Sequence, residues 1–205
     1  MKIICVGRNY TDHIKELGNS TPEAPVLFLK PATALLKENL PFYHPEFSSD
    51  IHHELELVVR IEKNGKSIAE KFAHKYYTHV SLGIDFTARD LQAECKKKGL
   101  PWEISKAFDH SAVIGEFVEL SKFPDWKEKG LDFSLLKNGT LVQKANHCEM
   151  LNTIDAVIAY ASQFFTLQKG DLLYTGTPAG VSKIQIGDIL QGFLFEQELF
   201  RTEVK

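Results

Sequence analysis

Short apolar runs separated by turn signals recur along the whole chain, and they predict strands. The runs are four to seven residues long, which is the length of a strand rather than a helix. The pair Asn138-Gly139, between FSLLK and TLVQK, is typical of a tight β-hairpin turn. Strands outnumber helices, which favours an α+β or mainly β fold over a doubly wound sheet. The apolar runs lie at residues 3–6, 26–29, 55–61, 172–175 and 189–195.

Three segments have a helical pattern instead. Asn9 with Asp12, and Thr87 with Asp90, have the three-residue spacing of a capping box and predict two helices. The first of these, near residues 9–18, would have barely two turns, a length that is marginal in isolation. A third helix is predicted where apolar residues recur at helical spacing, at Ile154, Val157, Ile158, Ala161 and Phe165.

The stretch HHELELVV, residues 52–59, places two carboxylates beside each other. Alternate side chains of a strand point to opposite faces, so Glu54 and Glu56 share a face with His52, while His53 lies on the other. On a solvated face this pattern is ordinary. On an enclosed face the two carboxylates need a cation or must take up protons.

A third carboxylate, Asp85, ends the apolar run SLGID just before the second predicted helix. Functional side chains are common at such strand ends. Together with Glu54 and Glu56 it makes an oxygen-rich set that suits Mg²⁺ or Mn²⁺, whereas the sequence has no Cys/His cluster typical of zinc sites. From spacing alone, a solvated acidic face is the simpler interpretation.

Two lysines lie in otherwise apolar segments. In WEISKAF, a strand would place Lys106 on the same face as Trp102 and Phe108, where an ammonium group needs a negative partner. Lys30 has the same relation to Phe28. The competing interpretation is that each lysine extends its ammonium group to solvent.

Two polar pairs have helical spacing. Arg89 and Gln92 share a face of the second predicted helix, where Arg89 could hold a carboxylate with two hydrogen bonds. His13 and Glu16 have the same spacing on the first helix, and a carboxylate that orients an imidazole makes it a better general base. A surface ion pair is the competing explanation for both pairs.

The segment YTGTPAGV surrounds Thr177 with two glycines and a proline directly after a predicted strand. Such a turn can present backbone N–H groups and a hydroxyl to a carboxylate, although a plain tight turn has the same composition. The GxxxxGK[ST] pattern of a phosphate-binding loop is absent from the sequence.

Composition narrows the class of protein. With 205 residues, 43% of them hydrophobic and 25% charged, the chain is expected to form a single globular domain, residues 1–205. A net charge of −3 argues against nucleic acid as a partner.

No apolar run approaches the roughly 20 residues of a membrane span, and MKIICVGRNY resembles a strand rather than a signal peptide, so a cytosolic location is expected. Three separated cysteines argue against a disulfide framework.

Taken in order, these segments resemble the fumarylacetoacetate hydrolase family, in particular its short acylpyruvase and oxaloacetate-decarboxylase branch. The similar stretches are CVGRNYTDHIKELG, PVLFLKPATAL, HHELELVV, GIDFTARDLQAECKKKGLPWEISKAFD and LLYTGTPAGV. The resemblance implies a strand-rich α+β fold, a mixed, barrel-like β-roll with few helices, and a homodimer. It also implies that the helix near residues 9–18 is a lid that orders over the substrate.

The resemblance also implies a role for each candidate residue. Glu54, Glu56 and Asp85 would bind Mg²⁺ or Mn²⁺, and His13 with Glu16 would form a base dyad on the lid helix. The oxygens of the substrate would be held by Lys106, Arg89, Gln92, Lys30 and Thr177.

Three functions follow from these groups. The leading hypothesis is a Mg²⁺- or Mn²⁺-dependent hydrolase of acylpyruvate-type 2,4-dioxo acids. In it, His13 helped by Glu16 activates water, and C–C cleavage releases a carboxylic acid and a pyruvate enolate held by the metal and Lys106. The alternative is an oxaloacetate decarboxylase or a keto–enol isomerase that uses the same enolate. The third is a non-catalytic β-rich binding protein, which would show no specific metal binding.

Overall fold

The computed structural model describes residues 1–16, 18, 20–37 and 39–205, and short strands account for most of its regular structure. The strands are β1 (Ile3–Gly7), β2 (Val26–Lys30), β3 (Leu35–Leu36), β4 (Ile51–His53), β5 (Leu55–Arg60), β6 (His79–Asp85), β7 (Thr87–Ala88), β8 (Ala112–Ile114), β9 (Val118–Glu119), β10 (Asp132–Lys137), β11 (Thr140–Asn146), β12 (Leu172–Tyr174), β13 (Ser182–Lys183), β14 (Ile189–Leu194) and β15 (Gln197–Glu203).

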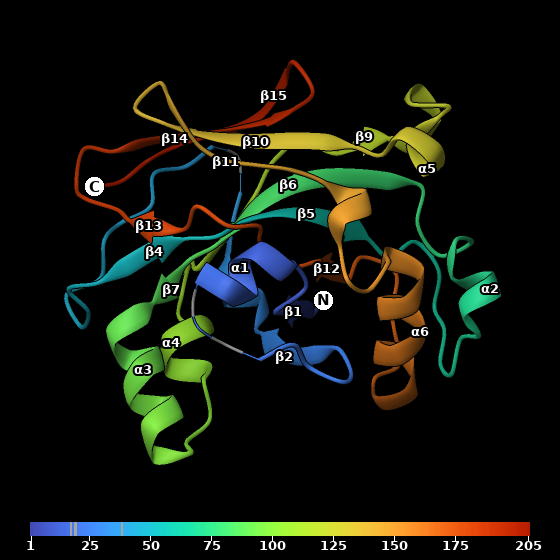
Figure 1. The fold of residues 1–205 in the computed structure, drawn as a ribbon, viewed down its shortest axis with the longest axis horizontal. Helices are drawn as coiled ribbons and strands as arrows, with labels where there is room; N and C mark the ends of the chain where they lie inside the picture. Colours follow the sequence, from blue (N-terminus) through green and yellow to red (C-terminus); the bar gives the residue numbers. More distant parts are fainter. Residues whose placement is uncertain (17, 19, 38) are drawn as a thin grey trace.

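The described helices are short. Those described are α1 (Thr11–Glu16), α2 (Glu70–Ala73), α3 (Arg89–Lys98), α4 (Glu103–Lys106), α5 (Trp126–Lys129) and α6 (Ile154–Phe164), with 3-10 turns at Ala32–Ala34, Leu120–Lys122 and His147–Glu149. Helices α3 and α4 lie at one end of the strands and α2 and α6 at the other (Figure 1). Among the described residues, no helix combines the length and the apolar character of a membrane span.

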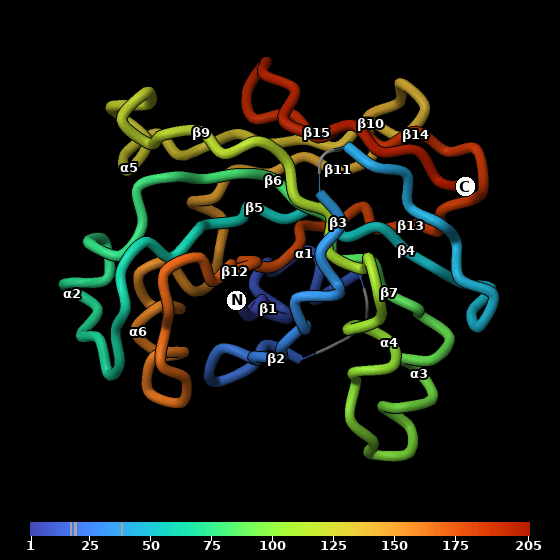
Figure 2. Tube along the Cα trace, turned by 180° about the vertical axis from the view of Figure 1, so that it is seen from behind, coloured from blue at the N-terminus to red at the C-terminus, as the bar shows by residue number. Residues whose placement is uncertain are grey.

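The strands form a curled mixed sheet that faces a smaller one. In the described part of the chain the large sheet has the order β2-β1-β12-β5-β6-β8-β3, with β9 also paired to β6. Only β1–β12 and β3–β8 are parallel pairs among its described strands. A second sheet, β11-β10-β14-β15, lies across it, and β13-β4-β7 forms a small third sheet (Figures 1 and 2). This strand-rich mixed arrangement confirms the predicted fold class.

Strand β5 is covered on both faces, and this burial encloses the candidate carboxylates. Leu55, Leu57 and Val59 belong to the main core, while Val58 belongs to a second apolar cluster with Tyr174 on the opposite face. The β5 side chains between Leu55 and Val59 are therefore all withdrawn from water. A polar residue in this strand has to find its partners inside the protein.

Several local predictions are confirmed. The predicted hairpin is β10–β11, with Asn138 at φ 53° and Gly139 at φ 77°, the positive values that a tight hairpin turn requires. The third helix is α6, whose Thr153 side chain accepts a hydrogen bond from the Ala156 N–H at 3.2 Å. All five apolar runs coincide with strands, at β1, β2, β5, β12 and β14.

The prediction of a capping box is wrong at both helices. The Asn9 side chain forms hydrogen bonds with distant backbone groups instead: its amide donates to the Thr175 carbonyl at 2.8 Å, and its side-chain oxygen accepts from the Asn152 N–H at 2.8 Å. Thr87 belongs to β7, and Asp90 accepts from the Ser48 hydroxyl at 2.7 Å. The helices themselves are present as α1 and α3, although Leu17 of the first lies outside the described residues.

The prediction of a strand in the segment WEISKAF is also wrong, because residues 103–106 form the helix α4. Trp102 precedes this helix, and its carbonyl accepts from the Ser105 hydroxyl at 2.7 Å. Lys106 is the last residue of α4 and is buried. The inward direction expected for its side chain therefore arises from a single helical turn rather than from strand alternation.

Candidate active site

Three buried carboxylates meet where β5 and β6 lie side by side. Glu54 immediately precedes β5, Glu56 lies in it, and Asp85 ends β6. The Asp85 N–H donates to the Glu54 carbonyl at 2.9 Å, which aligns the two strand ends. One ligand oxygen from each carboxylate lies within 4.8 Å of the others, and the residues are only 5%, 1% and 0% exposed. The face is therefore enclosed, and the solvated-face interpretation is wrong.

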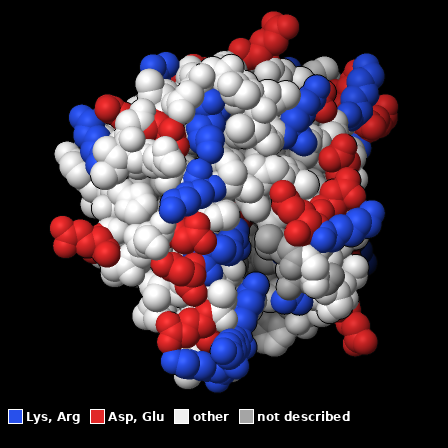
Figure 3. All heavy atoms as spheres, turned by 60° about the vertical axis from the view of Figure 1, so that its left-hand side comes forward, with Lys and Arg blue, Asp and Glu red and all other residues white. Residues whose placement is uncertain are grey.

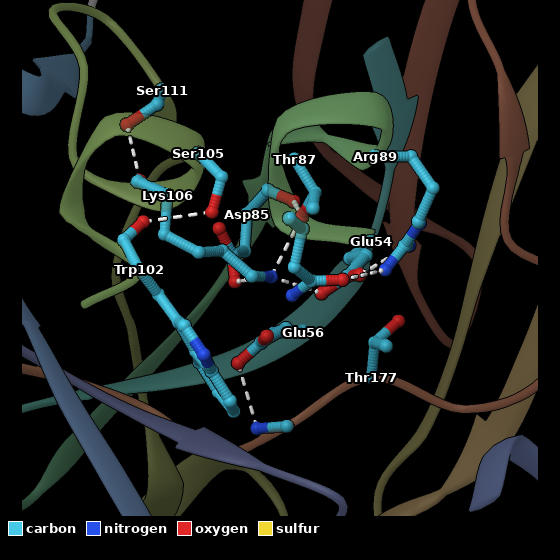
Figure 4. A network of polar contacts seen from close by, with 12 residues as sticks. Glu54, Glu56, Asp85, Thr87, Arg89, Trp102, Ser105, Lys106, Ser111 and Thr177 are labelled. Atoms are coloured by element: carbon cyan, nitrogen blue, oxygen red, sulfur yellow. Dashed lines mark hydrogen bonds and ion pairs between the residues drawn. The ribbon is translucent and has the colours of Figure 1, made fainter. Parts of the chain in front are cut away.

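The Lys106 ammonium group contacts this carboxylate cluster from α4. Its Nζ donates to Glu54 Oε2 at 2.7 Å, Asp85 Oδ2 at 2.6 Å and the Thr87 hydroxyl at 2.6 Å (Figure 4). These three bonds engage all of its N–H donors. Burial alone would lower the pKa of Lys106, but the carboxylates of Asp85 and Glu54 raise it above its ordinary value, so the group stays charged.

Lys30 reaches Asp85 from the other side. Its Nζ lies 2.7 Å from Asp85 Oδ1 and donates to the carbonyl and hydroxyl of Ser111 at 3.0 and 2.9 Å, and to the Lys106 carbonyl. Lys30 is therefore a neighbour of the carboxylate cluster. It does not line the cavity in front of it.

Arg89 and Gln92 lie together on α3, as their spacing predicts. Arg89 donates to Glu54 Oε1 at 2.6 Å through Nη2 and to Gln92 Oε1 at 2.8 Å through Nη1. Its Nε is buried and has no hydrogen-bond partner in the described part of the chain. Burial acts to raise the pKa of Glu54, but Lys106 and Arg89 outweigh it and hold that pKa well below its usual range.

Glu56 differs from the other two carboxylates. It accepts a hydrogen bond from the Gly176 N–H at 2.6 Å, and no Lys or Arg of the described residues lies within ion-pair distance of it. Burial, followed by the charges of Asp85 and Glu54, raises its pKa well above the ordinary value. A hard divalent cation would let all three carboxylates ionise together, so this oxygen donor set fits Mg²⁺ or Mn²⁺.

His13 and Glu16 form a pair on α1. His13 Nδ1 lies 3.1 Å from Glu16 Oε2, and the His13 side chain is buried. Glu16 Oε1 also accepts from the Gly180 N–H at 3.0 Å, which links α1 to the turn that follows β12. In the same turn, the Thr177 hydroxyl accepts from Gln143 at 2.9 Å.

A cavity of about 40 Å³ lies between these elements. Eight of the ten candidate residues line it, the exceptions being Glu16 and Lys30. The sequence reasoning missed the other six lining residues: Val6, Gly7, Arg8, Phe28, Lys96 and Trp102. Of these, Lys96 alone could have been predicted from the sequence, because it lies on the same helix face as Arg89 and Gln92, one turn further along.

Comparisons with known proteins identify the family of the chain. The model of the fumarylacetoacetate (FAA) hydrolase C-terminal family matches residues 2–200. The mitochondrial oxaloacetate tautomerase FAHD1 of Mus musculus is 42% identical over 203 residues, covering 99% of this chain and 91% of that protein. The oxaloacetate tautomerase YcgM of Escherichia coli K12 is 41% identical over 189 residues, covering 92% and 86%.

A solved structure adds a metal to the comparison. Fumarylpyruvate hydrolase from Pseudomonas aeruginosa, solved in complex with Mn²⁺ and pyruvate, is 34% identical and superimposes with a TM-score of 0.92. The match covers 100% of this chain and 89% of that chain.

Proposed function

Because the chain belongs to the fumarylacetoacetate hydrolase family, we propose that it is a divalent-metal-dependent enzyme that interconverts the keto and enol forms of oxaloacetate. The names of the two tautomerase relatives favour this function over the acylpyruvate hydrolysis expected first from the sequence. The observation that carries the proposal is the enclosed cluster of Glu54, Glu56 and Asp85 in contact with the Lys106 ammonium group.

In this proposal Glu54, Glu56 and Asp85 hold Mg²⁺ or Mn²⁺. When bound, the cation supplies positive charge beside the carboxylate and keto oxygens of a 2-oxo acid. Tautomerisation moves one proton between C3 of oxaloacetate and the keto oxygen. The protein therefore has to provide a base for C3 and a stabilising donor for the oxygen.

His13 is the proposed base. With its Nδ1–H donated to Glu16, the imidazole presents an unprotonated Nε2 for the C3 proton, and the Glu16 carboxylate then stabilises the imidazolium. Lys106 is the proposed donor to the keto oxygen. Its three N–H groups already donate to Glu54, Asp85 and Thr87. One of these hydrogen bonds therefore has to be replaced by a hydrogen bond to the keto oxygen when the substrate binds.

Movement of helix α1 as a lid is also part of the proposal. A volume of about 40 Å³ holds only a few water molecules, so a four-carbon diacid requires one wall to move. Helix α1 carries His13 and has six residues in the described part of the chain, and a helix of this length has little stability of its own. We propose that α1 opens to admit the substrate and closes to bring His13 over it.

Acylpyruvate hydrolysis is the second candidate. Two observations favour it: the His13–Glu16 pair, which is equally suited to activating water, and the likeness to the Pseudomonas hydrolase. Both reactions pass through an enolate, so the carboxylate cluster alone does not separate them.

The test is the ultraviolet absorbance of the enol of oxaloacetate, followed after chelator-stripped protein is mixed with freshly dissolved keto acid. We expect rapid equilibration only after Mg²⁺ or Mn²⁺ is added, and loss of it in Glu56→Gln. Metal ions accelerate enolisation by themselves, so the Glu56→Gln protein with the same metal concentration is the matched background.

Acetylpyruvate is assayed in parallel. Turnover of acetylpyruvate with no acceleration of oxaloacetate equilibration would overturn the proposal in favour of the hydrolase. Inactivity on both, with intact metal binding, would overturn both candidates. The homodimer and the cytosolic location remain predictions, and light scattering on the purified protein tests the first.

A further inference from the structure

Two cationic side chains line the cavity in addition to those already paired with the carboxylates: Arg8 and Lys96. Lys96 lies on α3 at seven residues from Arg89 and four from Gln92, so all three side chains occupy one face of the helix. Lys96 is exposed, whereas Glu56 and Asp85 are buried, which places Lys96 at the opening of the cavity. The face that carries α3 is hollowed, and side chains of both charges, Lys and Arg as well as Asp and Glu, lie around the hollow (Figure 3).

Arg8 is held in an unusual backbone conformation. It follows β1 in the sequence GRN and has φ 61°, a left-handed value that costs free energy in a residue with a side chain. Such outliers concentrate at functional sites, where the surrounding structure maintains the strain. Arg8 lines the cavity together with His13.

Neither cation has a counter-charge among the residues that the structure describes. In the described part of the chain no carboxylate forms an ion pair with Arg8 or Lys96, whereas Lys30 and Arg89 each form one and Lys106 forms two. The Lys96 ammonium group lies instead 5.5 Å from the centre of the Trp102 ring. Partial burial, then the charges of Arg89 and Arg8, lower its pKa from the ordinary value, which is the behaviour of a cation near other cations.

The distribution of charge separates two regions of one cavity. In the inner region, each of the three cations forms an ion pair with Glu54 or Asp85. In the outer region, Arg8 and Lys96 form no ion pair with any described carboxylate, and Lys96 lies over the aromatic ring of Trp102. A ligand that binds at the inner carboxylates and carries a second anionic group would place that group among the outer cations.

We propose that Arg8 and Lys96 form a subsite for the distal carboxylate of a dicarboxylic 2-oxo acid, and so select diacids over monocarboxylic 2-oxo acids. The inference rests on the proposed function, because it takes the 2-oxo acid end to lie at Glu54, Glu56 and Asp85. It adds a reason for substrate choice: a methyl group in place of the distal carboxylate would leave two cations without partners.

The test uses two non-reacting probes, 3,3-difluorooxaloacetate and 3,3-difluoro-2-oxobutanoate. Both lack C3 hydrogens and cannot enolise, and they differ only in a carboxylate against a methyl group. Their dissociation constants for the Mg²⁺-loaded protein are measured by titration calorimetry. We expect the wild type to prefer the diacid and Lys96→Gln to reduce that preference by about tenfold, because a charge-assisted hydrogen bond is lost.

Three further variants make the test specific. Arg8→Gln should reduce the preference in the same way, and Lys96→Arg should retain it because the positive charge is kept. Lys97→Gln is the matched control, since Lys97 is an adjacent exposed lysine that does not line the cavity. Equal binding of both probes by the wild type would overturn the subsite, as would an equal loss of both in Lys96→Gln.

The binding result is independent of turnover. If the wild type fails to tautomerise oxaloacetate but shows a Lys96-dependent preference for the diacid, the proposed function falls and the subsite stands. If it tautomerises oxaloacetate and binds both probes equally, the subsite falls and the proposed function stands.

Discussion

Lys30 Nζ lies 2.7 Å from Asp85 Oδ1, and both side chains are almost completely buried. The second oxygen of Asp85 accepts from Lys106, so this carboxylate lies between two ammonium groups. One consequence is that both oxygens of Asp85 are within ion-pair distance of an ammonium group even without a metal ion. Another is that its position is fixed before any ligand arrives, which reduces the ordering that metal binding has to impose.

Replacing Lys30 should therefore destabilise the metal-free protein. Lys30→Met leaves a buried, partly compensated carboxylate, and removal of one partner of a buried ion pair costs about 3–5 kcal/mol. Urea unfolding in the presence of a chelator measures the change. Lys129→Met is the control, because its ion pair with Asp125 is exposed and should contribute less than about 1 kcal/mol. A similar loss of unfolding free energy in the two variants would contradict a stabilising buried ion pair between Lys30 and Asp85.

Glu56→Gln should have opposite effects on metal affinity and on metal-free stability. The amide can still accept from the Gly176 N–H, and it never ionises. The variant therefore avoids the cost, present in the wild type at neutral pH, of keeping a proton or a third adjacent negative charge at this buried position, so the melting temperature without metal should rise. Loss of a ligand charge should weaken Mn²⁺ binding by at least about tenfold, since even partners of metal ligands contribute that much.

Electron paramagnetic resonance of free Mn²⁺ during a titration measures this affinity, and differential scanning calorimetry measures the melting temperature. Glu94→Gln is the matched variant, because Glu94 is exposed on α3 and pairs with Lys98. Unchanged Mn²⁺ affinity in Glu56→Gln would remove Glu56 from the metal site.

His147 should make stability depend on pH far from the cavity. Its Nδ1 accepts from the Leu131 N–H at 2.9 Å, and burial lowers its pKa below the ordinary value of 6.5. The unfolded chain therefore binds a proton at His147 at a higher pH than the folded protein does. Its contribution to stability is complete above pH 6.5 and is lost as the pH falls below that value.

The difference between wild type and His147→Gln, measured by urea unfolding at a series of pH values, isolates this contribution. The wild type should lose more stability than the variant on acidification from neutral pH to pH 5. Parallel pH profiles for the two proteins would show that His147 does not titrate differently in the folded state.

Ligand binding should protect α1 from proteolysis. Lys15 is exposed on this helix, so trypsin can cleave after it when the helix opens. Mg²⁺ together with oxalate, a small diacid that mimics the 2-oxo acid end, should slow this cleavage severalfold. Cleavage after Lys129 on α5 is the internal reference and should not change. Equal protection at both sites would indicate general stabilisation rather than closure of a lid.

The sequence predicts well those features that a local pattern determines. Period-two alternation places Glu54 and Glu56 on one face, and an Asn-Gly pair is sufficient for the β10–β11 turn. Burial of that face could not be predicted from the segment itself, because it depends on β12 and on the cluster around Tyr174, more than a hundred residues away.

Features that depend on distant partners were missed or wrongly assigned. Asn9 has the spacing of a helix cap, yet its side chain bonds to Asn152 and Thr175 instead. These contacts use both its amide donor and its carbonyl oxygen, whereas a cap would use the oxygen alone. Helix α4 has one turn and no periodic signal, so Lys106 could be expected to be buried but not to lie on a helix. Arg8 had no signal, because its left-handed backbone is not encoded by a recognisable motif.

The parallel pairing of β1 with β12 has a consequence for the order of folding. Ile3 lies opposite Leu172, and β12 is the strand that separates β1 from β5. A ribosome has to deliver nearly the whole chain before β1 can occupy its place beside the carboxylate strands. Such high contact order slows folding. During synthesis the acidic strands β5 and β6 therefore exist for some time without the segment that brings Arg8 and His13 to them.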